Sequence, residues 1–304
     1  MIPGLLLCVV LGANNLSTCL GTSIGPRRLR YSQALVLASI GLMAGILLEG
    51  NKLSRAITLG IVASYNPQFA LVVALSSLAV MTFLTYRKLP ISLSQVAIGA
   101  AVGAAIAAGI EVNWNFALLI VLSWLSTPVV GFALANFLSF LTRRIGKRVK
   151  GVFTQNIMYS YLTILSGVYA SYALGANTVG LVVGLVSSPT SQNLIVSVTL
   201  GLATILGMLL FSRGTTLSVA ENIVGLNPSA SFASQMGGAA TVHGFTEFGI
   251  PVSVSQAVVG GIFGAAMNRK IVVKNDRLTR EIVLGWTIAP LLGAGLAVII
   301  HLFL

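Results

Sequence analysis

Acidic residues are scarce in this sequence, which has six Asp and Glu against 18 Lys and Arg in 304 residues. The acids are scattered along the chain, so no cluster of Asp, His and Lys indicates an enzyme, for example one acting on phosphorylated lipid. Cys8 and Cys19 are too far apart for a disulfide, because a helix separates them by roughly 16 Å. Two thiols alone do not make a metal site, and we expect no cofactor.

Long polar stretches are also missing, which excludes a large catalytic or receptor domain outside the membrane. Hydrophobic residues make up 56% of the chain, and apolar runs of spanning length follow one another. This pattern predicts an all-α integral membrane protein with several spans, expected in the cell membrane. The first run lacks a basic segment and a cleavage site, so we interpret it as a retained span rather than a signal peptide.

The apolar runs predict ten spans, and residues 56–64 read as a short interfacial segment. The spans lie near residues 2–21, 32–50, 66–86, 90–108, 114–140, 152–184, 194–212, 228–248, 250–267 and 282–304. The run 152–184 is long enough for one broken helix or two short ones. For residues 66–106, a pair of re-entrant half-helices is an alternative to two full spans. We prefer full spans there, because half-helices would lift Arg87 and Lys88 toward the middle of the membrane.

The basic residues give a net charge of +12, but they do not form the single face that nucleic acid would need. They lie in short loops, at 27–30, 87–88, 143–150 and 269–280. Such clusters mark the cytoplasmic side of a membrane protein. With ten spans, all of them fall on that side, and the turns that carry Glu111 and Glu247 face outward.

The sequence is written twice. Residues 89–106, LPISLSQVAIGAAVGAAI, return at 250–267 as IPVSVSQAVVGGIFGAAM, and GAN at 12–14 returns at 175–177. The offsets lie between 161 and 163 residues, so the chain is two copies of one unit. We divide it into residues 1–150, which include the basic connecting loop, and 151–304. An odd number of spans per copy turns the second copy upside down, as in many secondary transporters.

The repeated Pro-x-Ser-x-Ser-Gln stretch predicts a pair of helix starts. Proline suits the first turn of a helix, and the serines and glutamine follow it there. Unpaired N–H groups and the helix dipole favour an anion at such a place. We therefore expect the anion to contact Ser92, Ser94, Gln95, Ser253, Ser255 and Gln256. The plainer interpretation is that the serines are ordinary helix caps.

The GAN segments predict interruptions in the first helix of each copy, because Gly and short polar side chains stand inside apolar runs. In inverted-repeat transporters, broken helices surround a substrate held near the middle of the membrane. This adds Asn14, Asn15, Thr18, Asn177 and Thr178 to the expected substrate site. The alternative is that these amides only bond between helices.

Together these motifs resemble the paired signatures of the inorganic phosphate transporter (PiT) family. GANNLSTCLGTSIG and LPISLSQ in the first half, with GANTVGLVVG and IPVSVSQ in the second, are similar to the family's GANDxxNxxG and PVSTTH. The resemblance covers nearly the whole chain in the right order. It implies two inverted halves of about five helices with broken or re-entrant helices at the centre, and an anion permease that in many members is coupled to sodium or protons.

The chain departs from these signatures at the charged positions. Asn15 and Thr178 stand where the family has Asp, and Gln95 and Gln256 stand where it has His. A sodium site near Asn15 and Thr178 would have less negative charge to attract the ion. A site without acids also suits sulfate, which carries no proton, so the chain reads as a divergent member, with the sulfate permease type as a rival.

We therefore expect alternating-access transport of phosphate or sulfate, with a passive anion channel as a further alternative. His243 and Glu247 lie one helical turn apart and form a candidate pair for proton coupling. We expect the protein to contact lipid and to form a homodimer.

Overall fold

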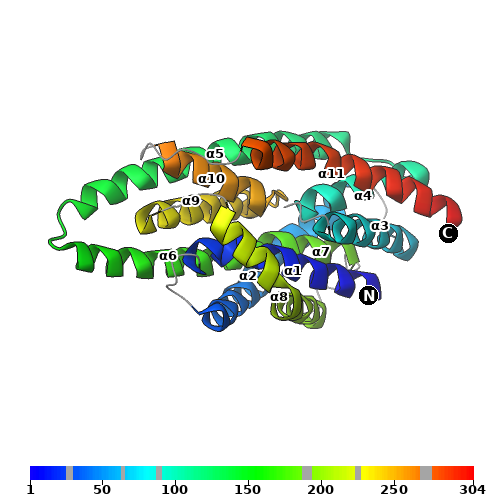
Figure 1. The fold of residues 1–304 in the computed structure, drawn as a ribbon. Coiled ribbons are helices and arrows are strands. Elements are labelled where there is room, and N and C mark those ends of the chain that lie inside the picture. The colour runs from blue at the N-terminus through cyan, green and yellow to red at the C-terminus, as the bar shows by residue number, and fades with distance from the viewer. Residues whose placement is uncertain (25–29, 63–65, 87–90, 187–193, 223–226, 268–275) are drawn as a thin grey trace.

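The computed structural model describes residues 1–24, 30–62, 66–86, 91–186, 194–222, 227–267 and 276–304 (Figure 1). Its helices are α1 (Ile2–Ile24), α2 (Tyr31–Gly60), α3 (Pro67–Tyr86), α4 (Leu93–Ala107), α5 (Trp114–Gly146), α6 (Val152–Leu174), the π-helix η1 (Gly175–Val179), α7 (Gly180–Val186), α8 (Leu194–Asn222), α9 (Pro228–Glu247), α10 (Val254–Met267) and α11 (Asp276–Phe303). Apart from one isolated β-bridge between Val62 and Val112, the regular structure of these residues is helical. The prediction of an all-α fold is confirmed.

Six of the described helical stretches are long and apolar enough to cross a membrane. The protein is a multi-pass integral membrane protein, and α5 shows why such a helix is stable there. Its Leu118, Leu122, Leu125 and Val129 lie on one side and are exposed. A continuous apolar stripe of this kind is costly in water and favourable against lipid.

The expectation of ten full spans is not met at α4 and α10. They have 15 and 14 residues, which gives lengths of about 22 and 21 Å, against about 30 Å of hydrocarbon. These lengths favour the re-entrant alternative. The expected interfacial segment at 56–64 is also wrong in part, because α2 continues through it to Gly60.

The predicted interruption occurs in one half only. In the second half α6 passes into the π-helix η1 at Gly175, so the chain breaks its regular turn at the predicted place. In the first half α1 runs through the GAN segment as a regular helix, and that prediction was wrong. There the Asn15 amide donates to the carbonyl of Leu11, 3.1 Å away and one turn back, so the side chain bonds within the helix.

The two halves of the sequence pack crosswise. α4 of the first half lies against α11 of the second, and α10 of the second lies against α5 of the first. Glycine permits both contacts: Gly99 meets the backbone of Pro290, and Gly260 meets the backbone of Pro128. The same exchange joins α1 to α8 and η1 to α2. The division at residue 150 stays a prediction, and helices from the two sides of it pack against each other.

Candidate functional site

The starts of α4 and α10 meet near the centre of the molecule (Figure 1). Ser94 at the start of α4 donates its hydroxyl to the carbonyl of Val252, just before α10, at 3.1 Å. The Ser92 and Ser94 hydroxyls lie 2.8 Å apart. Two segments separated by more than half of the chain thus touch through the motif that the sequence repeats.

The serines, not the prolines, begin these helices. Ser92 is the N-cap of α4, and the Ser253 hydroxyl accepts a hydrogen bond from the Gln256 amide at 3.2 Å, as an N-cap does. Pro251 lies ahead of the first helical residue of α10, so the expectation of proline in the first turn was wrong there; Pro90 lies outside the described residues. The Ser253 hydroxyl can satisfy an end N–H of α10 and proline cannot, which explains the order there; the Ser92 hydroxyl pairs with Ser94 instead of capping α4.

Two buried amide oxygens at these starts have no partner. Gln95 Oε1 and Gln256 Oε1 are both buried and form no hydrogen bond within the described part of the chain. They occupy equivalent positions in the two repeats. Leaving a buried acceptor unpaired is costly, so a matched pair of them indicates a place where a ligand supplies the missing donors.

Asn177 is fully engaged with the segment ahead of α10. Its amide donates to Thr246 Oγ1 at 2.9 Å and to the carbonyl of Ile250 at 3.2 Å, and its oxygen accepts from the Val252 amide at 3.3 Å. The equivalent Asn14 donates to the carbonyl of Ile91 at 3.5 Å. These bonds favour the alternative interpretation of the sequence, in which the Asn14 and Asn177 side chains connect neighbouring segments of the protein.

The remaining predicted residues lie on α1, η1 and α10. Ser255 and Thr178 are buried, Asn15 is buried in α1, and Thr18 lies in α1 with its side chain outside the described part of the structure. Asn15 and Thr178 supply no carboxylate themselves, because they stand where the family signature has aspartate. The sodium site expected near them stays a prediction.

One contact of the site was not predicted. Trp124 of α5 donates its indole N–H to the carbonyl of Pro251 at 3.1 Å, and so holds the segment ahead of α10 from the side. The signal was present in the sequence, because Trp124 lies in VLSWLSTPVVG, which the second half repeats as VLGWTIAPLLG. The repeat marks the residue, but only the crosswise packing of α5 and α10 gives it a role.

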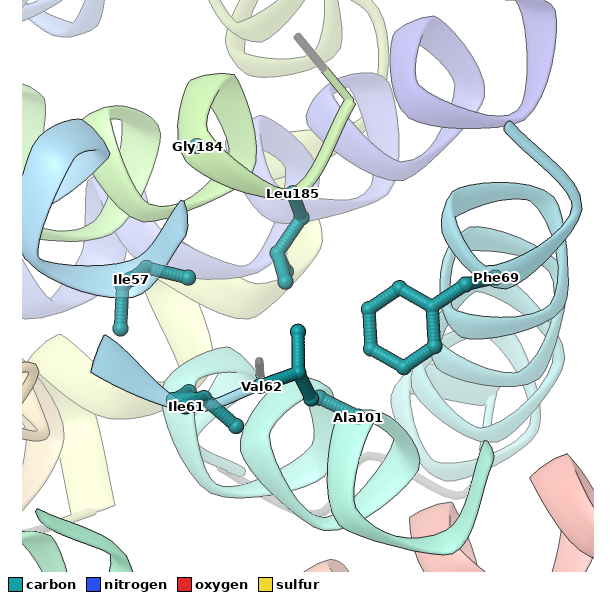
Figure 2. Close-up of a pocket in the computed structure, with 7 residues that line it drawn as sticks. All are labelled: Ile57, Ile61, Val62, Phe69, Ala101, Gly184 and Leu185. Atoms are coloured by element: carbon teal, nitrogen blue, oxygen red, sulfur yellow. The ribbon is translucent and has the colours of Figure 1, made fainter. Parts of the chain in front are cut away.

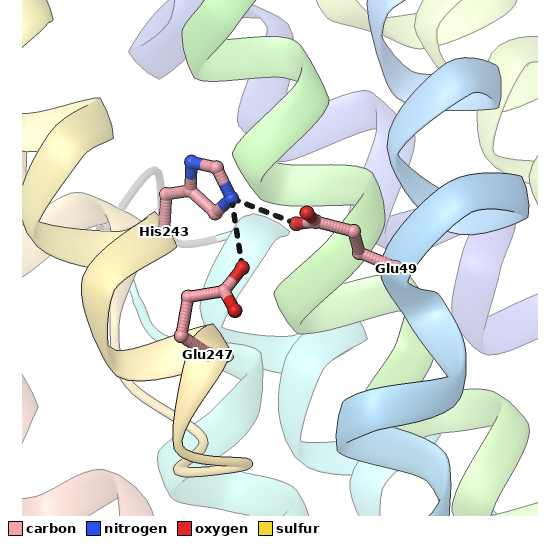
Figure 3. A group of neighbouring side chains, drawn as sticks. All are labelled: Glu49, His243 and Glu247. Carbon is pink, nitrogen blue, oxygen red and sulfur yellow. Dashed lines mark ion pairs between the residues drawn. The ribbon is translucent and has the colours of Figure 1, made fainter.

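The predicted pair His243 and Glu247 belongs to a larger group of side chains (Figure 3). His243 Nε2 lies 3.3 Å from Glu247 Oε1 and 2.8 Å from Glu49 Oε2 of α2. Lys52 Nζ lies 2.5 Å from Glu247 Oε1 and 3.3 Å from Glu49 Oε1. The sequence could not pair α2 with α9, so Glu49 and Lys52 were missed; proton coupling through this group stays a prediction.

Two cavities lie away from the helix starts. One is small and lined only by apolar side chains and a glycine, so it offers nothing to an anion (Figure 2); its lining is Ile57, Ile61, Val62, Phe69, Ala101, Gly184 and Leu185. The other has a volume of about 300 Å³. It lies at the start of α9, and Arg143, Lys147 and Asn227 are among its lining residues. Its basic lining gives it a positive charge.

Known proteins match this chain along its whole length. The phosphate transporter family matches residues 11–297. A Methanocaldococcus jannaschii protein named "Putative phosphate permease" is 30% identical over 97% of this chain and 93% of its own. The sulfate permease CysP of Bacillus subtilis is 25% identical over 97% of this chain and 84% of its own. The solved structure of a sodium-dependent phosphate transporter has the same fold, with a TM-score of 0.88, 21% identity and 99% and 97% of the two chains covered.

Proposed function

Because the chain belongs to the phosphate transporter family, we propose that it carries inorganic phosphate across the membrane by alternating access and holds the anion between the starts of α4 and α10. The observation that carries this proposal is the contact of the two starts through Ser94 and Val252. Each start presents first-turn N–H groups that have no partner within the helix, together with the positive end of its dipole. Two such ends pointing at one place attract an anion more strongly than either alone.

The repeated side chains complete the site. Ser253 and Ser255 supply hydroxyl donors, and Asn14 and Asn177 hold the backbone ahead of the helices in position. The Ser94 hydroxyl here donates to the Val252 carbonyl and the Ser92 hydroxyl to Ser94, so these two serines must turn their hydroxyls to donate to the anion. Asn15, Thr18 and Thr178 contribute from α1 and η1. The anion is thereby surrounded by donors inside the membrane, where each hydrogen bond to it is stronger than in water.

Gln95 and Gln256 favour phosphate over sulfate. Their buried oxygens are acceptors without donors. Hydrogen phosphate and dihydrogen phosphate carry O–H groups that can donate to them, whereas sulfate has none to give. Sulfate remains the second candidate substrate, because the CysP relative is a sulfate permease and because both motif aspartates are absent here.

The coupling ion and the assembly are further parts of the proposal. The ion is sodium near Asn15 and Thr178, or a proton; without the aspartates, a weak dependence on sodium is expected. The exposed apolar side chains of α5 and α11 meet lipid, or the same surface of a second copy in a homodimer.

Uptake into proteoliposomes tests the proposal. The purified protein should accumulate labelled phosphate with saturation and counterflow, and unlabelled phosphate should compete better than sulfate. Sodium and pH are varied in turn to identify the coupling ion. An ohmic current without saturation would indicate the passive channel, and uptake of neither anion under any gradient would refute transport by this site.

A further inference from the structure

Glu49, Lys52, His243 and Glu247, here called the histidine cluster, join the two repeats and take no part in the proposed anion site. Glu49 and Lys52 lie on α2 of the first half, and His243 and Glu247 lie on α9 of the second. Figure 3 shows the imidazole of His243 pointing between the two carboxylates. The cluster is partly exposed, with side-chain exposures of 17% for Glu49, 25% for His243 and 47% for Glu247, so ions from solution can reach it.

The three ligand atoms lie as a metal ion requires. His243 Nε2, one Glu49 oxygen and one Glu247 oxygen are all within 4.8 Å of one another. Zinc binds such atoms at about 2.0 to 2.2 Å, so one ion placed among them reaches all three with small side-chain movements. His243 Nε2 and Glu49 Oε2 are 2.8 Å apart and pair with each other, and neither atom has a further hydrogen-bond partner in the described structure. A metal ion that displaces the proton from Nε2 would bind both atoms after they move slightly apart.

Tyr169 of α6 orients the histidine for this task. Its hydroxyl lies 2.5 Å from His243 Nδ1, on the side of the ring opposite to the carboxylates. The rings of Tyr169 and Tyr172 meet the imidazole edge to face, at 5.5 and 5.6 Å. A metal on Nε2 requires the tautomer in which Nδ1–H donates to the Tyr169 oxygen, and such a bond from the second ring nitrogen is the usual support of a metal-binding histidine.

We propose that the histidine cluster is a zinc site, and that the Lys52 ammonium occupies it when the metal is absent. Lys52 bridges the two carboxylates that would bind the ion, and its side chain is 36% exposed, so it can swing into solution. The bound ion joins α2 of one repeat to α9 of the other. On the proposed transport function, this link holds the repeats in one arrangement and slows phosphate uptake.

The test measures zinc binding directly and does not depend on transport. Purified protein in detergent is titrated with ZnCl₂ by calorimetry, and its melting temperature is recorded with and without zinc. We expect one zinc ion per chain and a rise in melting temperature. His243→Ala and Glu49→Gln should abolish both, Tyr169→Phe should weaken binding roughly tenfold, and Lys52→Met should tighten it several-fold because the competing ammonium is gone.

His301, the other histidine of the chain, is the matched control. It lies in the last turn of α11, and His301→Ala should bind zinc as the wild type does. If His243→Ala does not fold, the other two variants decide the question, because Glu49→Gln should abolish zinc binding and Lys52→Met should tighten it. The proposal is overturned if zinc gives no heat and no shift in melting temperature, or if binding survives Glu49→Gln. Uptake of phosphate by the same preparation shows separately whether the transport function holds.

Discussion

Replacing Gln95 or Gln256 with leucine should reduce the preference for phosphate over sulfate. Each glutamine places a buried, unpaired oxygen at a helix start. An O–H group of phosphate satisfies it, but sulfate leaves it unpaired, at a cost of about 1 to 3 kcal/mol. That corresponds to roughly 5- to 150-fold in relative affinity for each glutamine. Leucine has no acceptor that sulfate could leave unpaired. Each single variant should therefore lose its share of the preference for phosphate over sulfate, and the double variant should lose more of it.

The assay is inhibition of labelled phosphate uptake by unlabelled phosphate and by sulfate in proteoliposomes. Leucine also removes two amide donors, but both anions accept from those donors, so the ratio of the two inhibition constants isolates the acceptor. Gln235→Leu is the control, because Gln235 is buried but bonded at both ends, to Ser166 and to the carbonyl of Cys19. The reasoning is refuted if the ratio is unchanged in the Gln95 and Gln256 variants, or if it changes equally in the control.

Four other substitutions test the packing of the helices. Asn177→Ala removes one hydrogen bond to Thr246 of α9 and two to the segment ahead of α10, and should weaken phosphate binding, measured as a higher half-saturation constant. Gly103→Ala should lower stability by about 1 to 3 kcal/mol, because its methyl group would overlap the backbone of α11. Gly295→Ala, with open space at its Cβ, should leave the melting temperature unchanged or slightly higher. Trp124→Phe leaves a carbonyl unpaired and should cost about 1 kcal/mol, read from the same melting curves.

The positions of the helices could be predicted from the sequence, but most contacts between helices that are distant in the chain could not. Apolar runs give the helices, and the repeated serine motif gives both helix starts, because these depend on neighbours in the chain. The contact from Ser94 to Val252 follows from crosswise packing of the repeats, which no local pattern encodes. Glu49 shows the same limit: it lies in an apolar run of α2, and only the packing of α2 near α9 brings it to His243.

The two GAN segments show that identical motifs can adopt different structures. Gly12-Ala13-Asn14 and Gly175-Ala176-Asn177 have the same letters, but only the second forms a π-helix. Asn177 bonds to Thr246 at the end of α9 and to Ile250 and Val252 ahead of α10, and the Asn14 amide donates to the carbonyl of Ile91. A π-turn redirects a side chain relative to a regular helix, so the two amides meet different partners. The repeats are thus in different conformations.

This asymmetry predicts how the transporter changes state. In inverted-repeat carriers the second state exchanges the conformations of the two halves. The bond from Ser94 to the Val252 carbonyl then has its counterpart in a bond from Ser255 to the Ile91 carbonyl, at the equivalent position of the other repeat. Ser94→Ala should therefore destabilise the present state by about 1 to 3 kcal/mol, and Ser255→Ala should destabilise the opposite one.

The two serine variants should consequently shift the equilibrium between the states in opposite directions, since a substitution moves a two-state equilibrium only by its differential effect on the two states. A single cysteine in place of Ser229, which is buried in the lining of the basic cavity, in a background with Cys8 and Cys19 replaced, reports opening on that side through its rate of modification. Ser94→Ala and Ser255→Ala should change that rate with opposite sign relative to the parent protein. If both variants change it with the same sign, the two helix starts do not exchange roles, and the alternating use of one paired site must be abandoned.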